Sequence, residues 1–72
     1  MSRSAIIAEF VSFCIESCAQ KWQISGVEVA AVFSRFGVFD YLVRGYEVLH
    51  SMGGEWLVED IGDFLHRRGY AA

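Results

Sequence analysis

Apolar side chains recur at helical spacing along this chain, and no proline interrupts them. Because an α-helix brings residues three and four apart onto one face, this spacing predicts helices that each bury one side. Glycines and capping residues mark the helix ends, since they accommodate or satisfy the backbone groups left unpaired there. We therefore predict an all-α fold, a small single domain of residues 1–72 whose four helices have these approximate bounds: Ser4 to Lys21, Gly26 to Phe36, Phe39 to Met52, and Glu59 to Arg68.

The first predicted helix has a wide apolar side. Ile6, Phe10 and Phe13 extend the apolar side around Cys14 and Cys18. We expect this helix to be buried over most of its circumference and to form the centre of the core. Its polar residues fall together on the opposite side: Glu9, Ser12, Glu16 and Gln20.

The other helices carry end signals of their own. Ser25, followed three residues later by Glu28, is a capping box, and Gly37 stands where a helix-ending glycine is expected. The two glycines at 53–54 are expected to end the third helix. Residues 55–58 fit either a short extended connector or the run-in to the last helix, and we favour the connector.

The chain is short for its apolar content. Of its 72 residues 54% are hydrophobic, including six Phe, three Tyr and two Trp. A domain of this size buries only about 60% of the surface that its unfolded chain exposes, so part of this apolar surface is expected to form a patch at an interface. The candidates for that patch are apolar residues at helix edges or in connectors: Val32, Phe39, Tyr41, Trp56 and Trp22.

The charge balance argues against nucleic acid as the partner. Six Lys and Arg residues against nine Asp and Glu residues give a net charge of -3, whereas phosphate binding needs a basic surface. A helix-turn-helix around Gly37 is still an open alternative. Its recognition helix would expose Asp40, Arg44, Glu47 and Ser51, and one arginine between two acids is poorly suited to DNA.

Cysteine usage and hydropathy indicate a cytoplasmic protein. Cys14 and Cys18 lie four residues apart on one predicted helix, which is a poor geometry for a disulfide. The first apolar run is interrupted by Glu9 and lacks a small-residue cleavage site, so no signal peptide is expected. No apolar stretch approaches the roughly 20 residues that span a bilayer, so we expect no membrane insertion.

Cys14, Cys18, His50 and His66 are the residue types of a Cys2His2 zinc site. The two histidines are far apart on different predicted helices, unlike the short ligand spacings of structural zinc sites. Both cysteines lie on the apolar side of their helix, where burial raises the pKa of a thiol and disfavours Cys–His catalysis. We therefore expect no metal, no cofactor and no enzymatic activity.

A set of short segments is spread over most of the chain, from about Phe10 to Phe64. Its members are Phe13-Cys14-Ile15-Glu16, Ser25-Gly26 with Glu28-Val29, Phe36-Gly37-Val38 with Asp40-Tyr41-Leu42, Tyr46 with Leu49-His50, and Val58-Glu59-Asp60-Ile61. In this order they resemble a family of small bacterial proteins of about this length whose function is unassigned. Such proteins are often encoded beside proteins that resemble ADP-ribosyltransferase toxins, so the resemblance implies a role as antitoxin or accessory subunit. It assigns no catalytic or binding residue.

These observations predict a non-catalytic protein-binding module, in keeping with the role that the resemblance implies. The expected partner is another protein chain, either a second copy of this chain or the product of a neighbouring gene. Two alternatives stay open: a small helix-turn-helix DNA-binding regulator and a homo-oligomeric structural protein.

Overall fold

The computed structural model describes residues 2–71, and within them it contains helices and no strand. The all-α prediction is therefore confirmed. There are five helices, with these bounds: α1 Arg3–Trp22, α2 Gly26–Phe36, α3 Val38–Arg44, α4 Tyr46–Leu49 and α5 Gly54–Arg67.

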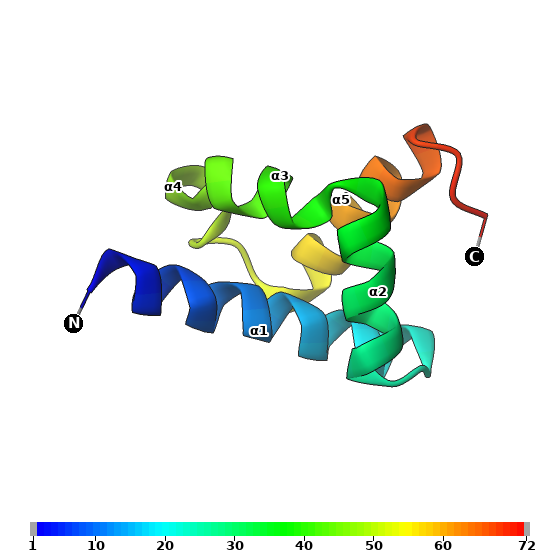
Figure 1. The fold of residues 1–72 in the computed structure, drawn as a ribbon, viewed down its shortest axis with the longest axis horizontal. Coiled ribbons are helices and arrows are strands. Elements are labelled where there is room, and N and C mark those ends of the chain that lie inside the picture. The colour runs from blue at the N-terminus through cyan, green and yellow to red at the C-terminus, as the bar shows by residue number, and fades with distance from the viewer. Residues whose placement is uncertain (1, 72) are drawn as a thin grey trace.

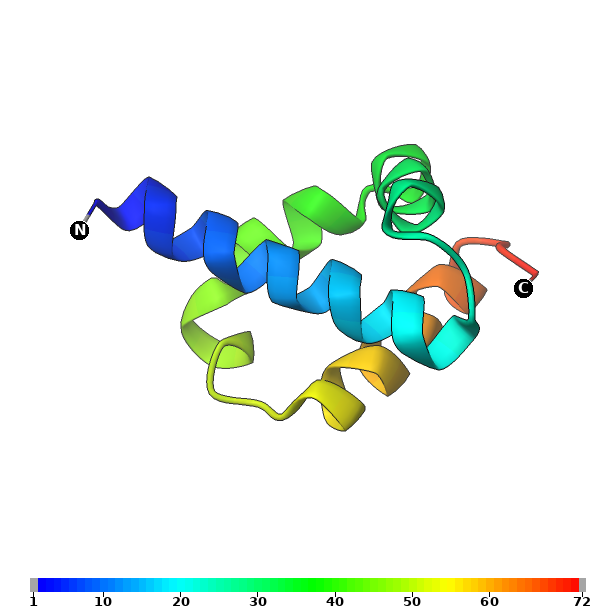
Figure 2. The same cartoon turned by 90° about the horizontal axis from the view of Figure 1, so that it is seen from below.

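The helices are arranged around α1, which runs along most of the longest dimension of the molecule (Figure 1). α2 stands across the end of α1, and α3 with α4 returns in the direction opposite to α1. α5 packs against both α1 and α3. The ends of the chain lie toward opposite ends of the molecule (Figures 1 and 2).

The predicted ends of α2 are confirmed by their hydrogen bonds. The backbone N–H of Glu28 donates to Ser25 Oγ over 3.1 Å, and the Glu28 carboxylate accepts from the Ser25 backbone N–H, which completes the capping box. At the other end Gly37 has φ 78°, a left-handed conformation that side chains disfavour, and its N–H donates to the carbonyl of Phe33. The turn into α3 is thus encoded locally.

The predicted third helix, Phe39 to Met52, is wrong in its continuity and its end. It divides at Gly45 into α3 and α4, and residues 50–52 form a turn. Gly45 is needed because a Cβ there would lie 2.8 Å from Leu49 Cδ1 and 3.1 Å from the Tyr41 carbonyl oxygen. The bend brings Leu49 into the core at 5% exposure. An amphipathic pattern that runs on through a glycine does not reveal such a bend.

The predicted extended connector at residues 55–58 is also wrong, because these residues form the first turns of α5. Leu57 and Val58 are buried and share a helical face with Ile61 and Leu65. Gly53 is the residue before the helix, with φ -75° and ψ 163°, and Gly54 is the first residue of α5, so the glycine pair begins the last helix instead of ending the third one. The connector before the last helix is residues 50–53 instead.

α1 is less buried than the sequence predicts. In the view from below (Figure 2), α1 crosses in front of α3 and α5, and α2 stands beside its C-terminal end, so no helix covers the side of α1 that faces the viewer. Ile6 and Phe13 are 38% and 46% exposed, and the prediction of burial around most of the helix is wrong. The core residues are Phe10, Cys14 and Cys18 of α1, Val29 and Phe33 of α2, Val38 and Leu42 of α3, Leu49 of α4, and Leu57, Val58, Ile61, Phe64 and Leu65 of α5.

None of the helices described here combines the length and hydropathy that crossing a membrane requires.

Candidate protein-binding surfaces

The five apolar residues predicted to form an interface occupy different environments. Trp56 is exposed, at 45%. Trp22, Val32, Phe39 and Tyr41 are half-buried and pack against the core. The ring of Phe39, for example, meets the buried ring of Phe33 edge to face, with centroids 5.6 Å apart.

Tyr41 is held in place by α5. Its ring stacks on Phe64 with centroids 4.4 Å apart, and its hydroxyl donates to Asp60 Oδ2 over 2.5 Å. Burial, together with the hydrogen bond to Asp60 and its negative charge, raises the pKa of Tyr41 to about 12, and the positive charge of Arg67 opposes the shift. The phenol is therefore neutral and acts as a fixed hydrogen-bond donor at neutral pH.

Trp56 lies on the side of α5 that faces this tyrosine. It precedes Asp60 by four residues, a spacing that places both on one face of the helix. Further along the helix, the guanidinium of Arg68 lies over the Phe64 ring, with Cζ 4.5 Å from the ring centroid. We call this surface the α3–α5 face and define it by Tyr41, Trp56, Asp60, Arg67 and Arg68.

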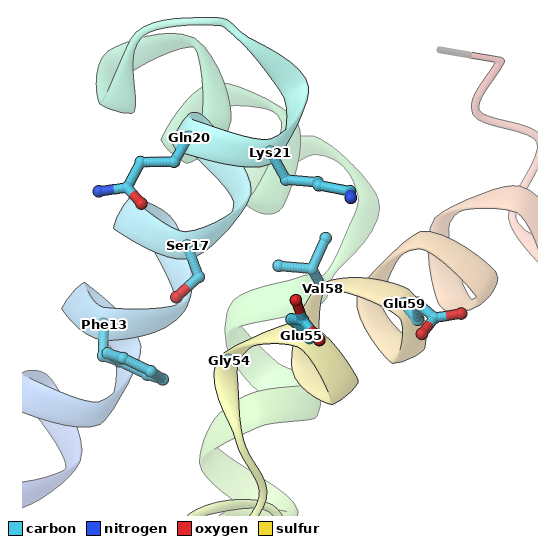
Figure 3. A pocket seen from close by; sticks show the side chains of 8 residues that line it. All are labelled: Phe13, Ser17, Gln20, Lys21, Gly54, Glu55, Val58 and Glu59. Carbon is cyan, nitrogen blue, oxygen red and sulfur yellow. The ribbon is translucent and has the colours of Figure 1, made fainter.

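A second surface is a groove between α1 and α5 (Figure 3), with a volume of about 860 Å³. We call it the α1–α5 groove. The two helices approach closely there, because a Cβ at Gly54 would lie 3.3 Å from both Phe13 Cζ and Ser17 Oγ. Its lining residues are Phe13, Ser17, Gln20 and Lys21 of α1, and Gly54, Glu55, Val58 and Glu59 of α5.

Sequence reasoning missed the exposed apolar residue of this groove. Phe13 follows Glu9 by four residues and therefore borders the polar stripe of α1, a signal that could have marked it as solvent-facing. Val27, Val43 and Val48 are also exposed.

The cysteines and histidines do not form a metal site within residues 2–71, where no three His, Cys, Asp or Glu side chains are grouped to hold an ion. Cys14 and Cys18 have no exposed surface, and burial raises their thiol pKa to about 11 and about 12. His50 stacks on Tyr46, with its Nδ1 2.8 Å from the carbonyl oxygen of that residue. His66 is exposed in the last turn of α5.

The helix-turn-helix alternative would use α2 and α3. α3 is only seven residues long, and its Arg44 pairs with Asp40 across 3.0 Å. Of the polar residues predicted to line the recognition helix, Glu47 lies on α4 and Ser51 in the turn after it. Asp40 thus partly neutralises Arg44, the one arginine of α3, and this disfavours phosphate binding.

Comparison with known proteins identifies a family. Residues 9–68 match the family described as "Protein of unknown function (DUF3791)", which agrees with the resemblance to a family of unassigned function. No curated protein and no solved structure matches the chain. The match covers most of the sequence, including α2 to α5 and most of α1, and the chain belongs to the DUF3791 family.

Proposed function

We propose that this protein is a non-catalytic binding module that docks on another protein chain through the α3–α5 face. The observation that carries the proposal is Trp56, a large aromatic side chain left 45% exposed four positions before Asp60, the residue that binds the Tyr41 hydroxyl. Trp, Tyr and Arg are the residues that most often dominate binding energy at protein interfaces. The face combines all three.

The face is arranged before any partner binds. The Tyr41 ring is stacked on Phe64 and its hydroxyl is fixed by Asp60, while Arg68 lies over the other aromatic ring of the stack. Side chains that are already ordered lose less conformational entropy on association. Such a face supports specific docking better than scattered exposed apolar residues would.

The charges of the face suit a partner that presents an acidic group beside an apolar pocket. Arg67 and Arg68 are exposed, and neither takes part in an ion pair that the structure of residues 2–71 contains. Arginine binds carboxylates through two parallel hydrogen bonds. The indole of Trp56 would fill the pocket, and the arginines would pair with carboxylates at its edge.

A neighbouring gene product is the partner that fits this role best. The family resemblance carries the expectation of proteins resembling ADP-ribosyltransferase toxins encoded nearby, for which this chain would be the antitoxin or an accessory subunit. Neutralisation by docking needs no chemistry of its own. The neutral, buried thiols of Cys14 and Cys18 are in keeping with a non-catalytic role.

The proposal is tested by co-expressing the chain with the product of the neighbouring gene and measuring the dissociation constant of the purified complex by calorimetry. Trp56→Ala should weaken binding by about 30-fold, the effect of losing a residue worth about 2 kcal/mol at an interface. Arg68→Ala should weaken it by a smaller factor.

Val27→Ala is the matched control, because Val27 is an exposed apolar residue at the start of α2, outside the α3–α5 face. Its affinity should equal that of the unmodified chain. A complex that tolerates Trp56→Ala, or loses affinity equally with Val27→Ala, would refute this face as the docking site. Failure to capture the neighbouring product would refute the antitoxin or accessory role.

A further inference from the structure

The α1–α5 groove is apolar at its base and open to solvent. Phe13 is 46% exposed at its edge, Val58 forms part of its floor, and Gly54 has no side chain to fill it. The base is far from Trp56 around the α5 helix, since Val58 and Trp56 differ by two positions and so point in different directions. The base of the groove and the α3–α5 face therefore point in different directions, and the two surfaces adjoin at Glu59, which follows Trp56 by three positions.

The two walls of the groove carry opposite charges. The α1 wall carries the ammonium group of Lys21 beside the neutral polar side chains of Ser17 and Gln20, whereas the α5 wall carries the carboxylates of Glu55 and Glu59 (Figure 3). Within residues 2–71 no hydrogen bond or ion pair joins the two walls. The charged groups of the two walls could pair with one another, but within the described chain they do not.

We propose that a second copy of this chain occupies the groove and forms a two-fold symmetric dimer. In a two-fold interface, residue i of one copy contacts residue j of the other, and residue j contacts residue i. Lys21 of each copy then meets Glu59 of the other, and the two Phe13 rings cover the apolar base. The complementary charges identify the occupant, because a second copy brings both walls at once.

The oligomeric state of the purified full chain gives the first test, measured by sedimentation equilibrium. The unmodified chain should be a dimer and Phe13→Asp a monomer, since a buried unpaired carboxylate would face its own symmetry mate. Val27→Asp, at a more exposed apolar position outside the groove, should remain dimeric. Circular dichroism should show the same helix content in all three proteins.

Charge exchange gives the second test. Lys21→Glu and Glu59→Lys should each weaken the dimer by about tenfold or more, because each places like charges against one another twice. Mixing the two variants should produce a heterodimer in which both contacts are again complementary, and the double variant K21E/E59K should again form a homodimer. Glu59 is a better residue than Glu55 for the charge exchange, because Glu55 also stabilises the first turn of α5 and its substitution would weaken the helix itself.

Several results would overturn the proposal. A monomeric unmodified chain would do so, as would a dimer unaffected by Phe13→Asp, or single-charge variants that fail to pair when mixed. If Lys21→Glu lowered the melting temperature but left the mass measured by sedimentation equilibrium unchanged, Lys21 would instead form its ion pair within one chain. A monomer that still bound its neighbouring gene product through Trp56 would leave the proposed function standing.

Discussion

The two cysteines show how burial governs the chemistry of a residue in this protein. Cys14 and Cys18 lie four residues apart on the inner side of α1, and both are fully enclosed by the core. Because the interior disfavours a charged thiolate, burial raises the pKa of Cys14 to about 11 and that of Cys18 to about 12. Their spacing is that of a metal-ligating pair, but their environment is that of small hydrophobic residues.

Neither thiol should therefore react in the folded protein. With iodoacetamide at pH 8, we expect no alkylation of Cys14 or Cys18 under native conditions and rapid alkylation of both in denaturant, because the thiolate is the reactive form. Mass spectrometry counts the added groups. Rapid native labelling of either cysteine would show that α1 is not packed as described.

Tyr41 provides a test of the packing of α3 on α5. Tyr41→Phe should lower the free energy of unfolding at pH 7 by about 1 kcal/mol, through loss of the hydrogen bond to Asp60. The pKa of Tyr41 is about 12 in the folded chain against 10.0 ordinarily, so the folded state holds the phenolic proton more tightly. Its contribution is complete below pH 10 and is lost as the pH rises toward 12.

The stability difference between the unmodified chain and Tyr41→Phe should accordingly shrink above pH 10. Chemical denaturation at a series of pH values measures this difference. The ionisation of the two cysteines also changes stability in this pH range, but it affects both proteins equally and cancels in the difference. A difference that stayed constant from pH 7 to pH 12 would contradict the hydrogen bond as the cause of the shift.

Two glycines of the helical region, Gly45 between α3 and α4 and Gly62 within α5, differ in whether the structure requires them. Gly45 lies against Leu49 and the backbone of Tyr41, whereas a Cβ at Gly62, in the middle of α5, would meet no atom within 4 Å. Gly62 therefore has no packing role that the structure explains. The same substitution should have opposite effects at these two glycines.

Gly62→Ala should stabilise the protein by about 1 kcal/mol, because alanine favours a helix over glycine and the site has room for a methyl group. The melting temperature should rise by roughly 4–8 °C for a domain of this size. Scanning calorimetry gives both quantities. A lower melting temperature would contradict the open space around Gly62.

Gly45→Ala should destabilise the protein by about 1–3 kcal/mol, because the added methyl group overpacks against Leu49, which is buried and has little room to move. Chemical denaturation of the two glycine variants side by side is the measurement. Equal effects of the two substitutions would contradict a specific requirement at the α3–α4 bend.

For the molecule as a whole, five helices in so short a chain cannot enclose the longest of them. α1 is covered on one side by α2, α3 and α5 and stays open on the other. This imbalance leaves Phe13 beside the α1–α5 groove, while Trp56 projects from a different face of α5. The result is a small domain with two adjoining surfaces that a protein chain can cover.

A dimer that forms through the groove should make thermal stability depend on protein concentration. The melting temperature of the unmodified chain should rise with concentration, because association stabilises the folded state by mass action, and that of Phe13→Asp should not. Scanning calorimetry over a hundredfold range of concentration tests this. A melting temperature that is independent of concentration in both proteins would argue against the dimer.

Local signals in the sequence were enough to define the all-α class, the bounds of α2 and the polar stripe of α1. The Ser25–Glu28 capping box and Gly37 act through hydrogen bonds and backbone conformations within a few residues, so they can be recognised without the fold. The aromatic surplus similarly predicted exposed apolar surface. Trp56 was expected to be accessible because it was placed in a connector, and it is exposed although it lies in α5.

Tertiary structure alone decided the break at Gly45, the start of α5 and the surface on which each aromatic lies. Periodicity shows which residues share a helical face, but not how many neighbours cover that face. Phe13 and Phe10 are equally apolar, yet Phe10 is covered by the core and Phe13 is not. That difference depends on the packing of helices from distant parts of the chain, which no local pattern contains.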